Sequence, residues 1–483
     1  MLTCLLVTCL VILTLAYIYK RLLKDAAKYA DIPAVSYRIP FIGNVFPLSQ
    51  THQILTQWAK VYGPIFRFSL FREEIVVLND YDSIHEALVV RGSDFAGRPR
   101  MRRTDYQNRN KNSIVWQSYT PKLKFLRKQI HSSLRMYGAG LDKLQNRCYA
   151  EIDKLLSHVE SYDGKPFDPW PLLYNSASNI MLDLTIGLSL THDGKEMTNL
   201  KEINELFNHS FGPGTSRILD QLPMFNFLQN EYKELKKALD LRDKFWMDHR
   251  TNCDKTGTNV DCIISDLQKL SSDVKHTLYD LTEDTLKETF TNLILAGTDT
   301  TATALTCLLL VLTRYPDVQD KIQEELDRTI MTSRAPALSD RGSVPYLEAC
   351  LLETLRFISH VPLAVPHSTI CDSMICGKRI PKDTTIYINL WALHHDEFWT
   401  NPWKFDPQRF LDTDGHLVPA HHVCRKRLLA FGAGRRVCLG ETLAKNRLFL
   451  FSASLLKKYR FVRSDGDTIE DIDPQTRSRK PNH

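Results

Sequence analysis

The most informative segment of this sequence runs from Phe431 to Gly440 and reads FGAGRRVCLG. Its closely spaced glycines predict a loop, and the residues that follow, Glu441 to Ala444, predict the start of a helix. Backbone N–H groups and a helix N-terminus help to keep a thiol deprotonated, and a thiolate is a strong ligand for haem iron. The segment therefore predicts that Cys438 is a metal ligand.

Several residue types coincide in this loop, which makes it more specific than a lone cysteine. A single buried cysteine is more often an inert small hydrophobe. Here five residue types occur together at fixed spacing, at Phe431, Gly434, Arg436, Cys438 and Gly440. Chance gives about one such coincidence per ten thousand chains. Arg436 is placed to pair with a haem propionate, and Gly434 and Gly440 to let the backbone pass close to a flat macrocycle. The predicted cofactor-binding residues of the loop are Phe431, Arg436, Cys438 and Gly440.

This loop resembles the signature of the cytochrome P450 family, of the animal microsomal type, and the resemblance covers essentially the whole chain. It implies a mainly α fold with a minor β-sheet, and one haem b whose iron is held by the Cys438 thiolate. The run from Tyr387 to Asp396 resembles steroid 17α-hydroxylases, whereas Ala335 to Arg341 and Pro381-Lys382 resemble the aryl-hydrocarbon and xenobiotic branch. The substrate therefore stays open between steroid-like and xenobiotic compounds.

A second segment, Leu295 to Thr301, lies within a long apolar helical pattern but contains a glycine and three threonines. These residues cost about 0.5–1 kcal/mol each in a helix interior, and such a local conflict suggests function. Taken alone, a threonine-rich stretch is more often helix packing. The resemblance implies that Ala296-Gly297 leaves room for dioxygen, that Ala296 adjoins both cofactor and substrate, and that Asp299 and Thr300 are the catalytic pair that delivers protons.

A third segment carries Glu353 and Arg356 at i, i+3 spacing, which alone indicates a surface ion pair. Because it precedes the run from Pro402 to Phe410, the resemblance implies a buried cluster that Arg409 completes. A buried ionic cluster costs desolvation energy. We therefore interpret Glu353, Arg356 and Arg409 as structural residues.

The resemblance adds Arg98, Arg127 and His367 as candidate partners of the haem propionates. The alternative for each is an ordinary surface or capping residue. Leu123 stands where the family has the tryptophan of its WxxxR helix. One propionate hydrogen bond, which contributes about 1–2 kcal/mol, is therefore expected to be missing.

The pocket-facing segments of the family correspond to Arg98–Thr104, Phe207–Arg217, Leu293–Thr301 and Val361–Val365. The last two are mostly apolar, which indicates a lipophilic small-molecule substrate. The predicted substrate-pocket residues are Asn208, Ala296, Val361, Leu363 and Ala364.

The N-terminal segment from Leu2 to Tyr19 is nearly continuously apolar. About 18 helical residues span roughly 27 Å, close to the hydrocarbon thickness of a bilayer. Lys20, Arg21 and Lys24 follow, whereas a cleaved signal peptide carries its positive charge before the apolar core. We predict an uncleaved single-pass anchor in the endoplasmic reticulum membrane with the catalytic domain in the cytosol, where the sequon Asn208-His209-Ser210 stays unmodified.

The remaining patterns predict a single helical body after this anchor. The predicted parts are a membrane signal-anchor helix at 1–20, a Pro/Gly linker at 21–45 and a haem-thiolate catalytic domain at 46–483. Alternating and helical periodicities predict a hairpin from 65–70 and 75–78, a strand near 384–388, and helices at 141–159, 231–245, 283–313 and 317–330. The polar stretch from Asn252 to Lys275 is predicted to be a mobile surface connection.

The formal net charge of +6 is too small to indicate nucleic-acid binding, and we expect none. The basic residues Lys122 to Lys128 and Arg425 to Arg436 fall in segments that the resemblance places on the sulfur side of the haem. There a positive surface would attract an acidic electron donor; generic solvated charge is the alternative. The implied partners are NADPH-cytochrome P450 reductase and, as a further candidate, cytochrome b5. The 11 cysteines, an odd number without CxxC pairs, indicate free thiols in a reducing compartment.

Together these features predict a haem-thiolate monooxygenase that hydroxylates a lipophilic substrate with O2 and electrons from NADPH. The alternative is a haem-thiolate binding or sensor protein with little turnover. Leu123, and a C-terminus that resembles only the beginning of the family's pocket-closing hairpin, favour this alternative slightly. The Asp299-Thr300 pair argues against it.

Overall fold

The computed structural model describes most of the catalytic body and only three residues of the N-terminal apolar segment. The described residues are Cys9, Ile12, Ala16 and the ranges 28–39, 42–71, 73–107, 112–134, 139–211, 230–255, 262–272 and 281–464. The predicted anchor helix at 1–20 and the predicted C-terminal segment from Asp471 therefore lie outside the described residues, apart from the three named above.

The described chain is mainly helical, as predicted, with short strands near both ends of the helical region. The longer helices are α2 (Thr51–Tyr62), α5 (Pro121–Ser133), α6 (Ala139–Ser161), α7 (Pro169–Ile186), α8 (Lys195–Phe211), α10 (Asn230–Lys255), α11 (Ile263–Ser272), α12 (Glu283–Arg314), α13 (Pro316–Thr329), α14 (Pro345–Ile358) and α17 (Glu441–Lys458). The shorter ones are η1 (Leu48–Gln50), α3 (Tyr81–His85), the π-helix η2 (Glu86–Val90), α4 (Arg102–Gln107), η5 (Leu338–Ser343), α15 (Leu390–His394), η6 (Pro407–Phe410), α16 (Val423–Arg427) and η7 (Gly434–Arg436).

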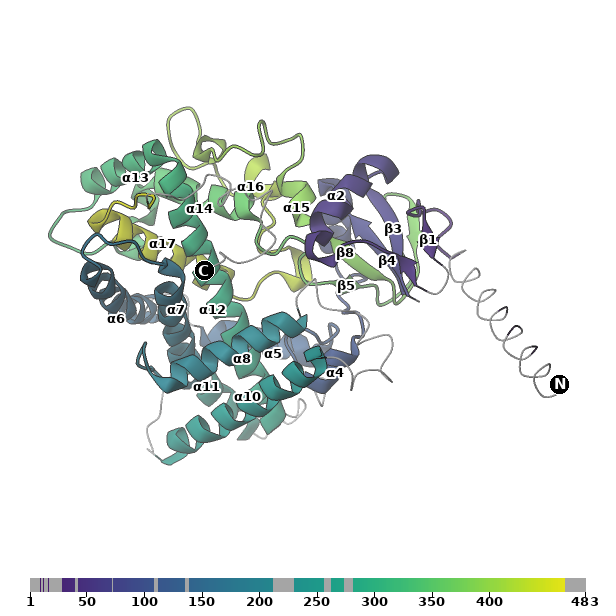
Figure 1. The fold of residues 1–483 in the computed structure, drawn as a ribbon, viewed down its shortest axis with the longest axis horizontal. Helices are drawn as coiled ribbons and strands as arrows, with labels where there is room; N and C mark the ends of the chain where they lie inside the picture. The colour runs from purple at the N-terminus through teal and green to yellow at the C-terminus, as the bar shows by residue number, and fades with distance from the viewer. Residues whose placement is uncertain are drawn as a thin grey trace.

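The strands form one larger sheet and one hairpin within the described residues. The strands are β1 (Arg38–Ile39), β2 (Gly43–Asn44), β3 (Ile65–Leu70), β4 (Glu73–Leu78), β5 (His367–Ser368), β6 (Ser373–Ile375), β7 (Lys378–Ile380) and β8 (Thr385–Ile388). The larger sheet has the order β1-β2-β3-β4-β8-β5, and β6 pairs with β7. Figure 1 shows the sheet on the N-terminal side of the molecule, beside the helical body.

The predicted hairpin forms as β3 and β4, whose antiparallel register runs from Ile65 opposite Leu78 to Leu70 opposite Glu73. The predicted strand near 384–388 is β8, which pairs in parallel with β4. Sequence-distant strands thus meet, because buried apolar side chains such as Val76 and Ile386 need a neighbour on both sides. This pairing brings β5 and the segment before it beside the N-terminal part of the chain.

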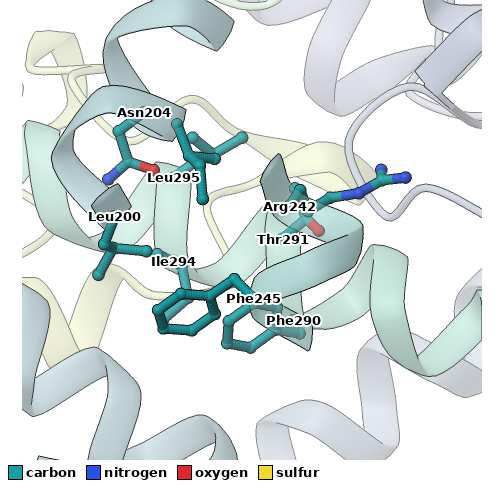
Figure 2. A pocket seen from close by; sticks show the side chains of 9 residues that line it. Leu200, Asn204, Arg242, Phe245, Phe290, Thr291, Ile294 and Leu295 are labelled. Atoms are coloured by element: carbon teal, nitrogen blue, oxygen red, sulfur yellow. The ribbon is translucent and has the colours of Figure 1, made fainter. Parts of the chain in front are cut away.

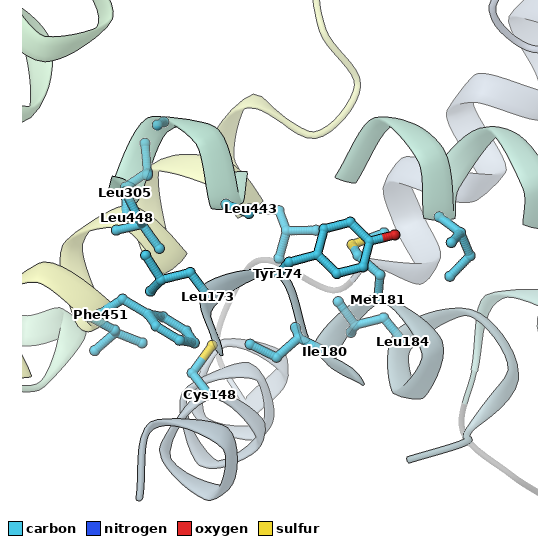
Figure 3. Close-up of a cluster of buried hydrophobic side chains, with 14 of the residues drawn as sticks. Cys148, Leu173, Tyr174, Ile180, Met181, Leu184, Leu305, Leu443, Leu448 and Phe451 are labelled. Atoms are coloured by element: carbon cyan, nitrogen blue, oxygen red, sulfur yellow. The ribbon is translucent and has the colours of Figure 1, made fainter. Parts of the chain in front are cut away.

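Helix α12 lies in the centre of the helical body and contacts α7, α14 and α17. Thr282 begins the helix by accepting a hydrogen bond from the Thr285 N–H. Side chains from α6, α7, α12 and α17 interlock in one large apolar core, of which Figure 3 shows a part. Within the described ranges, α12 is the helix that is long and apolar enough to cross a membrane. Of its most apolar 18-residue stretch, 56% is buried inside the structure. Core packing accounts for that composition.

Two expectations about loops were wrong. Part of the predicted mobile connection, Asn252 to Lys275, forms α11 and the end of α10. Ile263, Ile264 and Leu267 of α11 are buried in the main core, because their spacing gives even a short, mostly polar helix one apolar face. The end of the predicted linker at 21–45 likewise contributes β1 and β2 to the sheet.

Candidate functional site

The loop before α17 is closed on itself and positions Cys438 at its end. The Cys438 N–H donates to the Phe431 carbonyl at 2.8 Å, and the 3-10 turn η7 fills the space between them. Gly434 has φ +65°, and a Cβ there would lie 1.8 Å from the Leu88 carbonyl oxygen of η2. This glycine is therefore required by contact with η2, and its predicted role in letting the backbone pass close to a macrocycle stays a prediction. At Gly440, in contrast, a Cβ would meet no described atom within 4 Å.

The Cys438 sulfur is reached by solvent but is surrounded by protein on most sides. Burial raises the pKa of the Cys438 thiol, and the Gly440 N–H, Arg127 and Arg447 oppose this by favouring the thiolate. Arg127 comes from α5, whose start is fixed by Thr120, which accepts from the Leu123 N–H at 3.2 Å. The Arg127 Nη2 donates to the carbonyl of Val437 at 2.5 Å. Arg127 thus contacts the cysteine loop itself.

Arg98 and Arg436 lie close to Arg127, and none of the three has an ion-pair partner among the described residues. Arg98 is 8% exposed, and its Nε and Nη1 donate to the carbonyls of Val115, Val365 and Pro366 at 2.9–3.1 Å. Arg436 donates to the carbonyls of Ala96 and Gln117, and its Nη1 has no partner in the described chain. Burial and mutual repulsion with Arg436 and Arg127 lower the pKa of Arg98, and burial with Arg127 lowers that of Arg436 to about 10. Such a buried concentration of positive charge fits an anionic ligand.

His367 in β5 faces the same cluster. Gly97 pairs with Ser368 through two backbone hydrogen bonds of 3.0 Å, and this places Arg98 beside His367. The His367 Nδ1–H donates to the Phe95 carbonyl, at 2.8 Å, so Nε2 can donate only when the ring is protonated. Burial, Arg98 and Arg436 lower the pKa of His367. An anion placed among these groups would raise it again.

On α12, the turn from Ala296 to Thr301 presents different residues to different neighbours. Ala296 is exposed, and Asp299 and Thr300 are half-buried. The Thr300 hydroxyl donates to the Ala296 carbonyl at 2.6 Å, and the Asp299 charge adds to burial in raising the pKa of Tyr174. A Cβ at Gly297 would lie 2.5 Å from the Met181 sulfur of α7. The small size of Gly297 therefore serves helix packing against α7, and its predicted role in leaving room for dioxygen stays a prediction.

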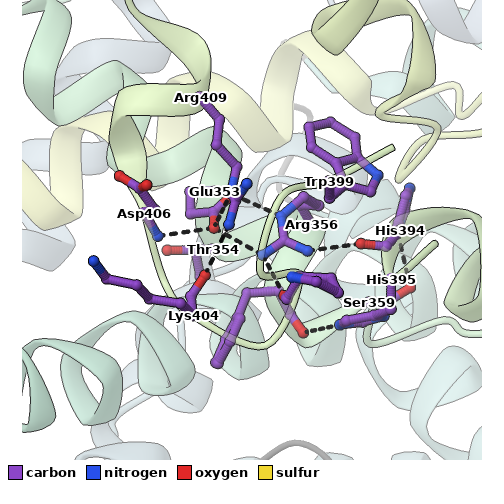
Figure 4. A network of polar contacts seen from close by, with 12 residues as sticks. Glu353, Thr354, Arg356, Ser359, His394, His395, Trp399, Lys404, Asp406 and Arg409 are labelled. Atoms are coloured by element: carbon purple, nitrogen blue, oxygen red, sulfur yellow. Dashed lines mark hydrogen bonds and ion pairs between the residues drawn. The ribbon is translucent and has the colours of Figure 1, made fainter. Parts of the chain in front are cut away.

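Glu353, Arg356 and Arg409 are brought together in one buried network, which Figure 4 shows. Arg356 and Glu353 are fully buried and form two bonds of 2.7 and 2.8 Å. Arg409 Nε lies 3.3 Å from Glu353 Oε1, which also accepts from the Asp406 N–H at 2.9 Å. Arg356 further donates to the carbonyl of His394 at 2.6 Å.

His394 connects this network to the cysteine loop. Its Nε2 accepts from the Leu429 N–H at 3.2 Å, so the proton is on Nδ1, which donates to Ser359. Nothing in the sequence pattern singled out His394, because a histidine that bonds distant backbone has no local signature.

Comparisons with known proteins agree with this geometry. Residues 33–482 match the cytochrome P450 family. A cytochrome P450 2U1 of Mus musculus is 34% identical over 86% of this chain and 78% of its own length. A steroid 17-alpha-hydroxylase/17,20 lyase of Rana dybowskii is 32% identical over 90% and 85%, and the human cytochrome P450 1B1 is 32% identical over 93% and 86%. A solved zebrafish cytochrome P450 structure with progesterone has a TM-score of 0.74 and 30% identity, covering 86% of this chain and 92% of that one.

The chain belongs to the cytochrome P450 family.

Membership makes this P450 a monooxygenase-family enzyme and implies a haem-thiolate cofactor. The residues fit that group in two independent respects. Cys438 supplies an accessible sulfur beside a Gly440 whose Cβ direction is open. The buried arginines supply the positive charge that two propionates would balance, including the unpartnered Nη1 of Arg436.

The P450 has a small apolar cavity between α8, α10 and α12, shown in Figure 2. Phe245 and Phe290 stack along one side, with ring centroids 6.1 Å apart. Asn204 lines the cavity, and so does Arg242, whose guanidinium points away from the two rings (Figure 2). Asn208, one turn after Asn204 on α8, is exposed and lies outside this lining. The lining residues are Leu200, Ile203, Asn204, Arg242, Phe245, Phe290, Thr291, Ile294 and Leu295.

The other predicted pocket residues of the P450 lie away from this cavity. Leu363 is buried among sheet residues such as Phe66 and Val77. Val361 is 36% exposed. Ala364 has a φ of +50° and packs, partly buried, against the apolar cluster that contains Val76 and Ile386. Leu123, at the expected tryptophan position, is fully buried in the main core. That the pocket residues face the substrate stays a prediction, because the resemblance places segments in the chain but does not say which side chains point into a cavity.

Beside the cavity, the buried pair of Glu288 and Arg242 yields a prediction about pH. Arg242 Nη1 donates to Glu288 at 2.6 Å, but burial still raises the pKa of Glu288 from 4.5 to about 7. Between these values the unfolded chain releases this proton and the folded chain keeps it. The contribution of this protonation to the free energy of unfolding is therefore fully present below pH 4.5. It falls by about 3 kcal/mol as the pH rises to 7.

We expect Glu288→Gln to remove this decline. The difference in free energy of unfolding between the variant and the wild type should grow between pH 4.5 and 7, as measured by urea unfolding at a series of pH values. Glu160→Gln, which alters an exposed pair with Lys458, is the matched control and should leave the pH profile unchanged. Parallel profiles for Glu288→Gln and wild type would contradict the prediction.

Proposed function

We propose that this P450 inserts one oxygen atom from O2 into a C–H bond of a lipophilic substrate, steroid-like or xenobiotic, with electrons that a reductase transfers from NADPH. The observation that carries the proposal is the cluster of arginines beside Cys438, in which Arg98 and Arg436 are buried and Arg127 is half-buried. Arg98, Arg127 and Arg436 converge there with no carboxylate partner among the described residues. That arrangement supports a dianionic macrocycle whose metal the sulfur ligates.

In this proposal the cysteine loop and β5 hold the cofactor. Cys438 would ligate the iron, Arg98, Arg436 and His367 would hold the propionates, and Arg127 fixes the loop through the Val437 carbonyl. Phe431 and Gly440 would adjoin the cofactor from the same loop, and Lys445 Nζ lies 5.2 Å from the Phe431 ring centroid. The bound haem supplies a thiolate-ligated iron at which dioxygen is activated.

The exposed face of α12 supplies the proton-handling groups. Ala296 keeps this face free of bulky side chains, and Asp299 and Thr300 stand one turn further along. The Thr300 hydroxyl donates to the Ala296 carbonyl, so its oxygen lone pairs remain available to accept a hydrogen bond from solvent or from a protonated Asp299. Proton delivery into an apolar space requires such a built-in relay.

The proposal of a lipophilic substrate rests on the apolar side chains of α12 and on the relatives, because the cavity, at about 10 Å³, is far smaller than a substrate-sized site. The walls of the cavity are mostly leucine, isoleucine and phenylalanine, and Asn204 and Arg242 add polar groups. Both a steroid 17-alpha-hydroxylase and a cytochrome P450 1B1 are among the relatives, so both substrate classes belong in the test.

The surface around the cysteine loop supports an acidic electron donor as partner, with NADPH-cytochrome P450 reductase as the proposed one and cytochrome b5 as a further candidate. Lys124, Lys128, Lys426 and Arg435 are exposed there. Arg427, in contrast, is turned inward to Asp396 and to the Phe398 ring, 4.4 Å away. The proposed location is the endoplasmic reticulum membrane, with the apolar segment 1–20 as anchor, 21–45 as linker and 46–483 as cytosolic catalytic domain.

We expect Thr300→Ala to divert NADPH-derived electrons into hydrogen peroxide, because the relay loses its hydroxyl. The measurement is the ratio of peroxide to NADPH consumed in the reconstituted system with reductase. Thr313→Ala is the matched control, since its hydroxyl also donates within α12, to the Leu310 carbonyl at 2.8 Å, but at the far end of the helix. An unchanged ratio in Thr300→Ala would remove Thr300 from the mechanism.

The experiment that decides the proposal is NADPH consumption by the purified full-length P450 with reductase, in the presence of a steroid panel and an aromatic-hydrocarbon panel. Product formation with either panel supports the proposal and identifies the substrate class. A haem-loaded protein that binds members of both panels but consumes NADPH no faster than reductase alone would favour the sensor alternative instead.

A further inference from the structure

Arg447 of α17 is a fully buried arginine that the proposed mechanism does not use. It is 1% exposed and follows Cys438 on the helix that begins directly after the cysteine loop. Its Nη2 donates to the Gly297 carbonyl and to the Thr301 hydroxyl of α12, at 2.8 Å each. Nε and Nη1 have no hydrogen-bond partner in the described chain.

The surroundings of Arg447 make its presence costly. Its neighbours on α17, Leu443, Leu448 and Phe451, are buried in the apolar cluster that Figure 3 shows together with Cys148 of α6. No ion pair of Arg447 exists among the residues that the structure describes. The negative charges that act on it are those of Cys148 and Cys438 when deprotonated. A leucine or methionine would fill such a site without the desolvation cost of a guanidinium, so packing alone does not account for an arginine.

The two acceptors of Arg447 belong to the turn that carries the proposed catalytic pair. The Thr301 hydroxyl donates to the Gly297 carbonyl at 3.1 Å, and the Thr300 hydroxyl donates to the Ala296 carbonyl. Two successive carbonyls of this turn are therefore engaged by side chains, one on the exposed face and one on the buried face. Arg447 bonds to the carbonyl on the buried face, that of Gly297.

Helical geometry couples the two hydrogen bonds of Arg447, called the clasp below, to the opposite, more exposed face of α12. Ala296, Asp299 and Thr300 lie on the same turn as Gly297 and Thr301, so a shift of the Gly297 carbonyl moves all of them together. Met181 of α7 closes the other side of Gly297 and prevents the turn from moving toward α7. The guanidinium thus sets the distance between this turn and the helix that follows Cys438.

We propose that Arg447 is a positioning residue for oxygen activation, which clasps the Gly297 carbonyl and the Thr301 hydroxyl and so fixes Ala296, Asp299 and Thr300 relative to the Cys438 side of the site. The inference rests on the proposed function for the role of Asp299 and Thr300. The clasp itself is a property of the protein that can be measured without turnover.

The test compares Arg447→Met and Arg447→Lys with the wild type in the haem-loaded full-length protein. Lys457→Met is the matched control, because Lys457 also lies on α17 and donates to a backbone carbonyl, that of Ile330, at 2.8 Å. The first readout is hydrogen–deuterium exchange of the backbone amides from 297 to 304. The second is the fraction of NADPH-derived electrons recovered as hydrogen peroxide.

In Arg447→Met we expect exchange at 297–304 to rise about ten-fold, since a hydrogen bond from a charged donor is lost. Exchange in α14 should stay unchanged, and the peroxide fraction should increase. Arg447→Lys, which keeps one donor and the charge, should lie between Arg447→Met and the wild type. Lys457→Met should change neither readout.

Unchanged exchange and unchanged peroxide in an Arg447→Met protein of normal haem content would overturn the proposal, and so would equal loosening of α12 and α14. If Arg447→Met does not fold, Thr301→Val decides, because it removes one acceptor and keeps the guanidinium; no local change in exchange would then refute the clasp. Failure of the proposed function would appear separately, as no NADPH consumption in the wild type, while the exchange result still stands.

Discussion

Replacing Cys438 by alanine abolishes, in our expectation, the red-shifted Soret band of the dithionite-reduced, carbon monoxide-bound protein. That band requires a thiolate ligand on the iron, which Cys438 would supply. Cys438 stands at the end of a closed loop, with Phe431 accepting from its N–H and Arg127 bonded to the preceding carbonyl. Because this backbone geometry does not need the sulfur, the variant should fold, and the loss should be complete.

Cys424→Ala is the control for this experiment. Cys424 lies in α16, shortly before the loop, and is half-buried like many structural cysteines. Its replacement should leave the Soret band in place. If Cys438→Ala kept the band, or if the wild type carried its porphyrin through an imidazole, the assignment of the metal ligand would be wrong.

The second large effect is expected from Arg356→Met, which should lower the free energy of unfolding by about 3–5 kcal/mol, since it leaves a buried carboxylate without its main partner. Glu353 and Arg356 have no exposed side-chain surface, and burial already raises the pKa of Glu353 against the opposing effect of Arg356. The variant also loses the bonds to the carbonyls of His394 and Pro402. Urea unfolding followed by far-UV circular dichroism measures the change.

The matched control is Arg379→Met, which breaks an ion pair of similar length with Asp372 at 2.9 Å, but on the surface. There the arginine and aspartate side chains are 65% and 57% exposed, so the loss should be about 0–1 kcal/mol. Equal destabilisation by the two variants would show that burial does not set the effect. Because His394 bonds both Arg356 and Leu429, Arg356→Met should also loosen the cysteine loop and reduce haem content.

Some features were predictable because they depend on local chemistry. The cysteine loop, the long helix around Thr300, the β3–β4 hairpin and the helical class all appear as patterns of residue type and spacing within short windows. The family-level function followed from the same loop, and the comparisons show that family. The short helix α11 was missed because its surroundings are polar, although Ile263, Ile264 and Leu267 already carried a helical face.

Other features depended on which distant segments meet. Gly434 is required by Leu88 and Gly297 by Met181, in both cases through a contact with a distant element. Asn204, and not Asn208, lines the cavity because of the rotation of α8 against α10 and α12. Arg447 reads as an ordinary basic residue in the sequence, and only the packing of α17 on α12 shows that it is buried and bonded to Gly297.

The sequence by itself determined the helical class and the order of the chemical segments, and it carries the prediction of Cys438 as the sulfur ligand, because hydrogen bonding and side-chain periodicity within one segment depend on that segment alone. The tertiary structure decided the charge environment of the sulfur, the lining of the cavity and the reason for Gly434 and Gly297. Each of these properties depends on contacts between groups that are far apart in the chain. Burial and Coulomb interactions depend on distance in space, and a linear pattern does not contain that distance.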